Sequence, residues 1–212
     1  MIYIFDDRHE RREMNSSLIN RYNRLISFAE IKCDTFEQLD HFISNELFEP
    51  SLVLLHNSYR YPGDRLDSDY VSSKFLEHDI PVILFSGGFI HPNQTLVYGK
   101  YQALSINSLV MYKNLDVYLK HLTYNENASI EILLWGESYI SNRISHTKSA
   151  IFRKICKVRP DSSMDEDMCQ EIHEIISDYL SGDELVATRK RFLDAISSSI
   201  NCQEFLNTIK SF

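Results

Sequence analysis

The sequence predicts an α/β domain built on a five-stranded parallel sheet, followed by a domain made only of helices. Short apolar runs recur along the first half of the chain, and segments with apolar residues at helical spacing separate them. Because the runs are apolar on both faces, helices are expected to cover both sides of the sheet. Strand signals vanish after a composition shift at residues 124–127. We therefore expect two domains, at residues 1–124 and 128–212.

Strands and helices are expected to alternate through the first domain. Four strands are predicted by the apolar runs at residues 2–5, 27–33, 52–55 and 81–85. Helices are predicted by a segment with Leu18, Ile19 and Tyr22 at helical spacing and by the ranges 35–47 and 67–78. Residues 89–106 fit a degraded helix or an extra strand. The apolar run at 109–112 predicts the fifth strand, and residues 114–123 predict a closing helix.

The second domain is predicted to contain helices at residues 129–157, from about 166 to Gly182, at 184–198 and at 202–211. The spacing of Ser163 and Glu166 is typical of a capping box. Trp135 lies among apolar residues and is either a core residue or an anchor in a protein interface. A compact basic cluster, Arg189, Lys190 and Arg191, is either a contact for a phosphate backbone or a solvated helix face.

The composition narrows the class of protein. A formal net charge of -8 argues against a general nucleic-acid binder, which needs clustered Lys and Arg. No apolar run approaches the roughly 20 residues of a membrane span, and the N-terminus lacks the pattern of a signal peptide. The four cysteines show no spacing typical of a zinc site, so we expect reduced thiols. We therefore expect a cytoplasmic protein without a cofactor and without a membrane segment.

Polar residues follow the predicted strands, where open parallel sheets place their ligands. These residues are Asp6, Asp7, His56, Asn57, Ser86 and Lys113. The set, in this order, resembles the receiver domain of two-component response regulators over about residues 1–123; no resemblance is found for the C-terminal half. The resemblance implies a flavodoxin-like, doubly wound sheet. It also implies that Asp6 and Asp7 match a magnesium-binding acid pair, Ser86 the switch hydroxyl and Lys113 the conserved lysine.

His56 departs from the receiver pattern because it stands where the family has its phospho-acceptor aspartate. Imidazole cannot form an acyl phosphate, and it adds no negative charge for magnesium. Asn57 is an amide and no better as a nucleophile. These departures indicate a pseudo-receiver in which Asp6 and Asp7 bind magnesium weakly at most.

Two classes of function follow from this interpretation. The first is a non-catalytic regulatory or adaptor protein that assembles with another protein or with itself. The loop residues Tyr59, Arg60 and Tyr61 are a candidate contact surface for it, because their position predicts that they are exposed. The second class is an atypical response regulator that is switched by a ligand or an unusual phosphorylation site, with the helical half as its output.

Overall fold

The computed structural model describes the chain except residues 46, 64, 90–93, 99–100, 126–127, 157–162 and 183–184, together with the side chains of 94–98 and 101–104. The chain divides into two compact units, Met1–Leu119 and Lys120–Phe212. The first unit contains the sheet, and the second contains helices. All four cysteines are free thiols.

The sheet of the first unit contains six strands within the described residues: β1 (Ile2–Phe5), β2 (Ile26–Ala29), β3 (Leu52–His56), β4 (Val82–Ser86), β5 (Gln94–Tyr98) and β6 (Tyr101–Asn107). Their order is β2-β1-β3-β4-β6-β5. Five of them are parallel, and β5 pairs antiparallel with β6 at one edge. The predicted five-stranded parallel sheet is therefore confirmed, but it carries an additional antiparallel strand. Of the two interpretations of residues 89–106, extra strand structure is the one observed in their described part.

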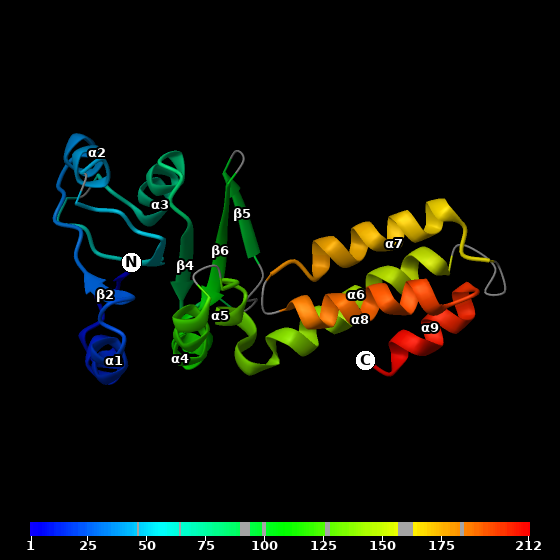
Figure 1. Cartoon of the computed structure of the whole chain (residues 1–212). Coiled ribbons are helices and arrows are strands. Elements are labelled where there is room, and N and C mark those ends of the chain that lie inside the picture. Colours follow the sequence, from blue (N-terminus) through cyan, green and yellow to red (C-terminus); the bar gives the residue numbers. More distant parts are fainter. Residues whose placement is uncertain are drawn as a thin grey trace. The chain divides into compact units, whose positions relative to one another are not determined.

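Four helices cover the sheet: α1 (His9–Arg21), α2 (Phe36–Ile43), α3 (Ser68–Glu77) and α4 (Ser108–Tyr124). Figure 1 shows α2 and α3 on one face of the sheet and α1 and α4 on the other. Side chains of alternate strand residues point to opposite faces, and Phe5, Val53 and Leu55 pack into one core with the buried residues of α2 and α3. The next residue after Phe5, Asp6, therefore faces α1 and α4.

The prediction of a strand at residues 109–112 was wrong, because these residues form the first turns of α4. A short apolar run does not by itself distinguish a strand from a buried helix. The burial pattern distinguishes them: Met111, Leu115 and Leu119 are buried at a spacing of four residues, whereas Leu109 is 77% exposed. Asn107 ends β6, and its side chain accepts a hydrogen bond from the main-chain N–H of Leu109. The fifth parallel strand is thus β6.

The second unit contains the last residues of α4, from Lys120 on, followed by α5 (Ile132–Trp135), the short 3-10 helix η1 (Gly136–Ser138), α6 (Tyr139–Ile155), α7 (Glu166–Tyr179), α8 (Val186–Ser198) and α9 (Cys202–Lys210). The predicted helical content of this part is confirmed. The capping residue of α7 is Asp165, which accepts from the N–H of Met168, whereas Ser163 forms a β-bridge with Asn201. None of the helices in the described part of the chain is long and apolar enough to cross a membrane.

Candidate functional site

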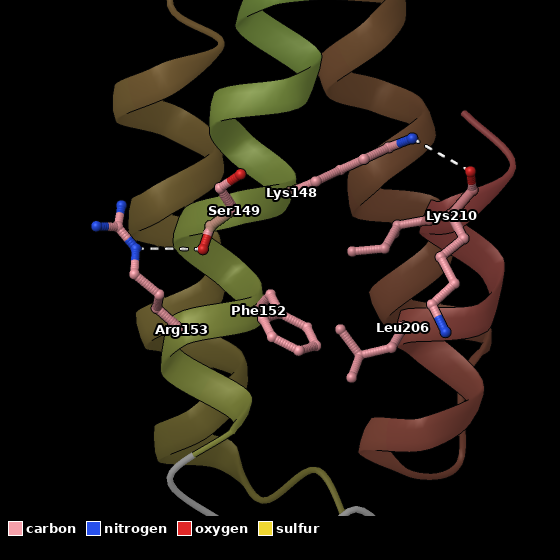
Figure 2. Close-up of a pocket in the computed structure, with 7 residues that line it drawn as sticks. Lys148, Ser149, Phe152, Arg153, Leu206 and Lys210 are labelled. Carbon is pink, nitrogen blue, oxygen red and sulfur yellow. Dashed lines mark hydrogen bonds between the residues drawn. The ribbon is translucent and has the colours of Figure 1, made fainter.

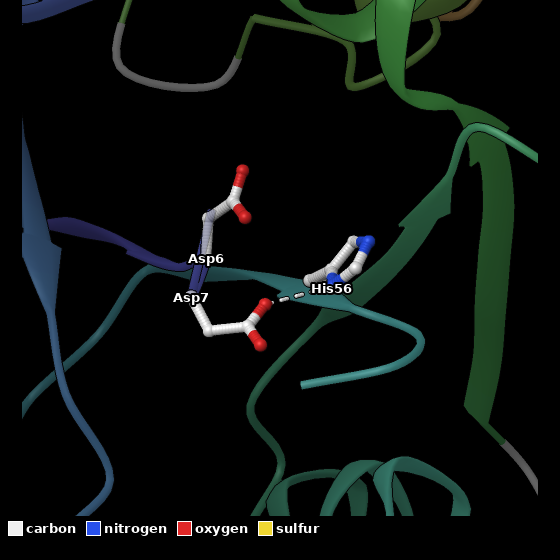
Figure 3. A group of neighbouring side chains, drawn as sticks. All are labelled: Asp6, Asp7 and His56. Carbon is white, nitrogen blue, oxygen red and sulfur yellow. Dashed lines mark ion pairs between the residues drawn. The ribbon is translucent and has the colours of Figure 1, made fainter. Parts of the chain in front are cut away.

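The candidate site lies at the carboxyl ends of two neighbouring parallel strands. Asp6 and Asp7 follow β1, and His56 is the last residue of β3, which pairs with β1. The ligand atoms of these three residues lie within 4.8 Å of one another. Figure 3 shows that the two carboxylates point in different directions and that Asp7 faces His56. The structure thus brings together three of the strand-end residues that the sequence singled out.

Asp6 is buried and is bound by a cation that the sequence analysis did not single out. Arg11, from the first half of α1, donates from Nε to Asp6 Oδ2 and from Nη2 to Oδ1, both at 2.8 Å. The Asp6 side chain is fully buried, and that of Arg11 is 25% exposed. Two parallel hydrogen bonds of this kind are the strongest form of Arg–carboxylate contact. The charge of Asp6 is thus neutralised from within the chain.

Two further donors complete the surroundings of Asp6. The main-chain N–H of Arg8 donates to Oδ1 at 3.0 Å, and the hydroxyl of Tyr112 on α4 donates to Oδ2 at 2.8 Å. Burial alone raises the pKa of Asp6, but the hydrogen bonds from Arg11, Arg8 and Tyr112 outweigh it, and the pKa is lowered. Asp6 is therefore ionised at neutral pH, with each of its two oxygens accepting two hydrogen bonds.

His56 lies beside the second acid. Its Nδ1 lies 3.2 Å from Asp7 Oδ1, and its ring packs 5.4 Å from that of Phe85. Burial lowers the pKa of His56, and the Arg11 cation lowers it further, whereas Asp6 and Asp7 raise it. The net shift is downward, so His56 is neutral at pH 7. The last residue of β3 is therefore an uncharged imidazole and not a carboxylate.

These residues do not fit a hard divalent cation such as Mg²⁺. Such an ion needs several oxygen ligands, but both oxygens of Asp6 are already bonded to Arg11. The third member of the cluster, His56, offers nitrogen. Asp7 is the remaining acid, and it faces His56 at 3.2 Å and the side chains of Arg8 and Arg60 at 3.9 Å. A magnesium ion at Asp6 would have to displace the Arg11 guanidinium.

The other predicted strand-end residues are placed differently. Ser86 ends β4, and its Oγ accepts from the N–H of Gly88 at 3.3 Å. Asn57 follows β3, and its N–H donates to the carbonyl of Phe85 at 2.9 Å. Lys113 does not follow a strand: it is exposed on α4 and forms no ion pair with any residue that the structure describes. This corrects its placement beside the acid pair.

Asn107 takes the place that the sequence analysis gave to Lys113, at the end of the fifth parallel strand. It is paired in register with Ser86. Its side-chain Nδ2 donates to the carbonyls of Gly87 and Phe89, at 3.3 and 3.0 Å. The amide of Asn107 thus ties the loop after β4 to the end of β6. No sequence pattern predicted this contact, because residues 89–106 fitted two interpretations.

The loop after β3 does not expose its aromatic residues as predicted. The Tyr59 hydroxyl accepts from the N–H of Ile31 at 3.1 Å, and Tyr61 lies 3.4 Å from the Ser68 hydroxyl. The two tyrosine rings pack against each other and against the core between the sheet and α2 and α3. Only Arg60 of the three is exposed. The hydrophobic effect of two large rings explains the difference.

The predicted contact residues of the second unit are largely engaged within it. Trp135 is half-buried, stacked on Tyr139. Arg189 donates to the carbonyl of Leu180, which follows α7, at 3.3 Å. Arg191 lies over the ring of Phe212, 4.5 Å from its centre. Of the basic cluster, Lys190 alone has no such contact in the described part of the chain, and Lys190 and Arg191 are exposed.

Comparisons with known proteins name no family for this arrangement: the chain matches no protein-family model, and no curated protein matches it.

Proposed function

We propose that this protein is a non-catalytic regulatory or adaptor protein whose first unit is a pseudo-receiver, and that it acts by assembly with another protein and not by aspartyl phosphorylation. The observation that carries the proposal is the bidentate pair between Arg11 and Asp6. In the receiver family that this region resembles, the matching acid helps to hold a magnesium ion. Here a guanidinium from the chain itself supplies the compensating charge.

Two further observations support the proposal. His56 stands at the acceptor position, where an aspartate would take the phosphoryl group. The end of the fifth parallel strand carries Asn107, which has no positive charge to grip phosphoryl oxygens. Of the four groups that the family uses, the acid pair and the Ser86 hydroxyl remain, and the acceptor and the lysine do not.

The strand order supports a flavodoxin-like, doubly wound sheet. When only parallel strands are counted, β2-β1-β3-β4-β6 becomes 2-1-3-4-5, the flavodoxin-like order. Helices on both faces fit that arrangement (Figure 1). The antiparallel strand β5 departs from that arrangement, because it extends the sheet by one strand beyond β6, its fifth parallel strand.

The proposal is tested by incubating the full chain with acetyl phosphate and MgCl₂ and measuring its intact mass. We expect no phosphoryl adduct, because His56 cannot form an acyl phosphate and Arg11 holds Asp6. The His56→Gln variant is the matched control, since it changes the acceptor position without adding a carboxylate. Stoichiometric phosphorylation that is stable in acid and labile in base would contradict the proposal.

The same experiment separates the alternative, a regulator switched through an unusual phosphorylation site. The convergence of Asp6, Asp7 and His56 within 4.8 Å favours this second candidate. A phosphohistidine at His56 would be labile in acid, stable in base and absent from His56→Gln. That outcome would replace assembly with switching as the function of the first unit.

A further inference from the structure

A groove in the second unit combines an apolar floor with a basic rim. It lies between α6 and α9 and has a volume of about 560 Å³. Figure 2 shows Phe152 of α6 and Leu206 of α9 pointing toward each other across it. Phe152 is 52% exposed, although it is a large apolar side chain, whereas Leu206 and Ile209 are buried. The groove therefore presents an uncovered aromatic ring above a packed apolar base.

The rim of this groove is formed by three cations, Lys148, Arg153 and Lys210. Lys148 crosses one end of the groove and donates to the main-chain oxygens of Lys210 and Phe212, at 3.2 and 3.0 Å. Arg153 lies on the other side of Phe152 and points away from it (Figure 2), with its Nε donating to the carbonyl of Ser149. Within the described residues, none of the three cations has a side-chain carboxylate at ion-pair distance.

The charge of α6 is unusual for this chain. The chain carries a net charge of -8, yet α6 contains no Asp or Glu along its 17 residues. Two of its cations are neutralised inside the unit, Arg143 by Glu131 and Lys154 by Glu171. Within the described residues, no side-chain carboxylate pairs with Arg153 or Lys210, and Lys148 is bonded to the main-chain oxygens of Lys210 and Phe212. The groove of this acidic protein thus has basic side chains and no acidic one in its lining, beside the exposed Phe152.

We propose that this groove binds an acidic amphipathic helix of a partner protein. An apolar stripe on such a helix would cover Phe152 and extend the base formed by Leu206 and Ile209, and its flanking carboxylates would pair with the rim. This is the helix-in-groove mode of recognition. The α6 residues that line the groove lie within positions 148–153, which span about 9 Å at 1.5 Å per residue, so about two turns of a partner helix cover it.

The basic rim also disfavours a second copy of this chain on the same face. A two-fold contact would bring the cations of one copy against those of the other, and like charges at an interface are costly. The inference rests on the proposed adaptor function and deepens it, because it assigns the chemistry of the partner and the surface that binds it.

The test places a photo-reactive residue in the groove of the full chain. Phe152→p-benzoylphenylalanine preserves an aromatic ring at this position, and Tyr124→p-benzoylphenylalanine is the matched control, since Tyr124 is an aromatic residue of the same unit that is 92% exposed. Both variants are expressed in the native host and irradiated, and the attached peptide is sequenced by mass spectrometry. We expect residue 152, and not residue 124, to capture an acidic amphipathic segment.

The captured segment is then synthesised and titrated against the purified chain. Arg153→Gln with Lys210→Gln leaves the hydrogen bonds of Lys148 in place, and we expect it to weaken the dissociation constant at least tenfold. Phe152→Ser is expected to weaken it by a similar factor, with an unchanged circular dichroism spectrum. Equal affinity in the charge variant would overturn the role of the rim, even if the segment binds.

The outcomes separate this inference from the adaptor function on which it rests. A lipid, a basic segment or a second copy of this chain attached at residue 152 overturns the inference. A partner protein captured at residue 124 but not at 152 also overturns it and leaves the adaptor function standing. If neither position captures a protein and the chain elutes from native lysate as a free monomer, both are overturned.

Discussion

Replacing Arg11 by methionine removes the cation that neutralises Asp6 and keeps an apolar stem of similar length. Asp6 is fully buried in the first unit, so the variant leaves an uncompensated charge there. Removing one partner of a buried ion pair costs about 3–5 kcal/mol. Arg11→Met is therefore expected to lower the free energy of unfolding by about that amount. With urea m-values of about 1–3 kcal/mol/M, this loss of free energy corresponds to a urea denaturation midpoint that is at least about 1 M lower.

The assay is urea denaturation followed by far-UV circular dichroism, with Arg12→Met as the control. Arg12 lies next to Arg11 on the same helix, but its partner Glu30 is 48% exposed. Exposed ion pairs contribute about 0–1 kcal/mol, so the control should lose little. The double variant Asp6→Asn with Arg11→Met should recover most of the loss, because no charge then remains buried. Equal midpoints for Arg11→Met and Arg12→Met would refute the reasoning.

Three further predictions concern the same unit. Burial holds the pKa of His56 below its ordinary 6.5 in the folded state only, so the unfolded chain binds the extra proton first and the free energy of unfolding falls as the pH drops below about 6.5. Urea melts of His56→Gln at several pH values should lack this pH dependence, and an identical dependence would exclude His56 as its source. Tyr112→Phe removes one donor to the buried carboxylate of Asp6 and should cost about 1–3 kcal/mol in the same melts, whereas a loss below about 0.5 kcal/mol would mean that Arg11 satisfies Asp6 alone. Gly63→Ala would place a Cβ 2.4 Å from the main-chain oxygen of Asp34 and should lower the thermal midpoint, as overpacking does; an unchanged midpoint would show that this loop shifts freely.

The positions of strand ends are the part of the site that the sequence predicted well. Ile2–Phe5 and Leu52–His56 are apolar runs with a polar residue at or after their ends, and that pattern alone places Asp6, Asp7 and His56 at one edge of the sheet. The prediction succeeds because a parallel sheet brings the carboxyl ends of neighbouring strands together. The fold class of the first unit follows from the same regularity.

The contacts that decide the chemistry of the site could not be predicted in this way. Arg11 lies in a polar segment with several arginines, and only the path of α1 shows which of them reaches Asp6. Tyr112 was assigned to a strand, so its hydroxyl could not be connected to β1. The error at residues 109–112 also misplaced Lys113, because Lys113 was expected at the end of that strand and instead lies within α4.

The prediction that the loop aromatics Tyr59 and Tyr61 are exposed failed for a different reason. A loop position and a flanking Pro62 and Gly63 suggest exposure, but the rings of Tyr59 and Tyr61 bury apolar area while their hydroxyls reach hydrogen-bond partners. Local sequence carries no information about that outcome. It depends on the space left between the sheet and α2 and α3.

The hold on Asp6 from both α1 and α4 also has an evolutionary consequence. Loss of Arg11 alone strands a buried charge, and gain of an aspartate at position 56 alone adds a second carboxylate beside Asp7 without freeing Asp6. A magnesium-binding site at this edge would need both positions to change together, because each single change is expected to destabilise the first unit. The pair between Arg11 and Asp6 therefore acts as a barrier: single substitutions in this sequence do not lead to a metal-binding site.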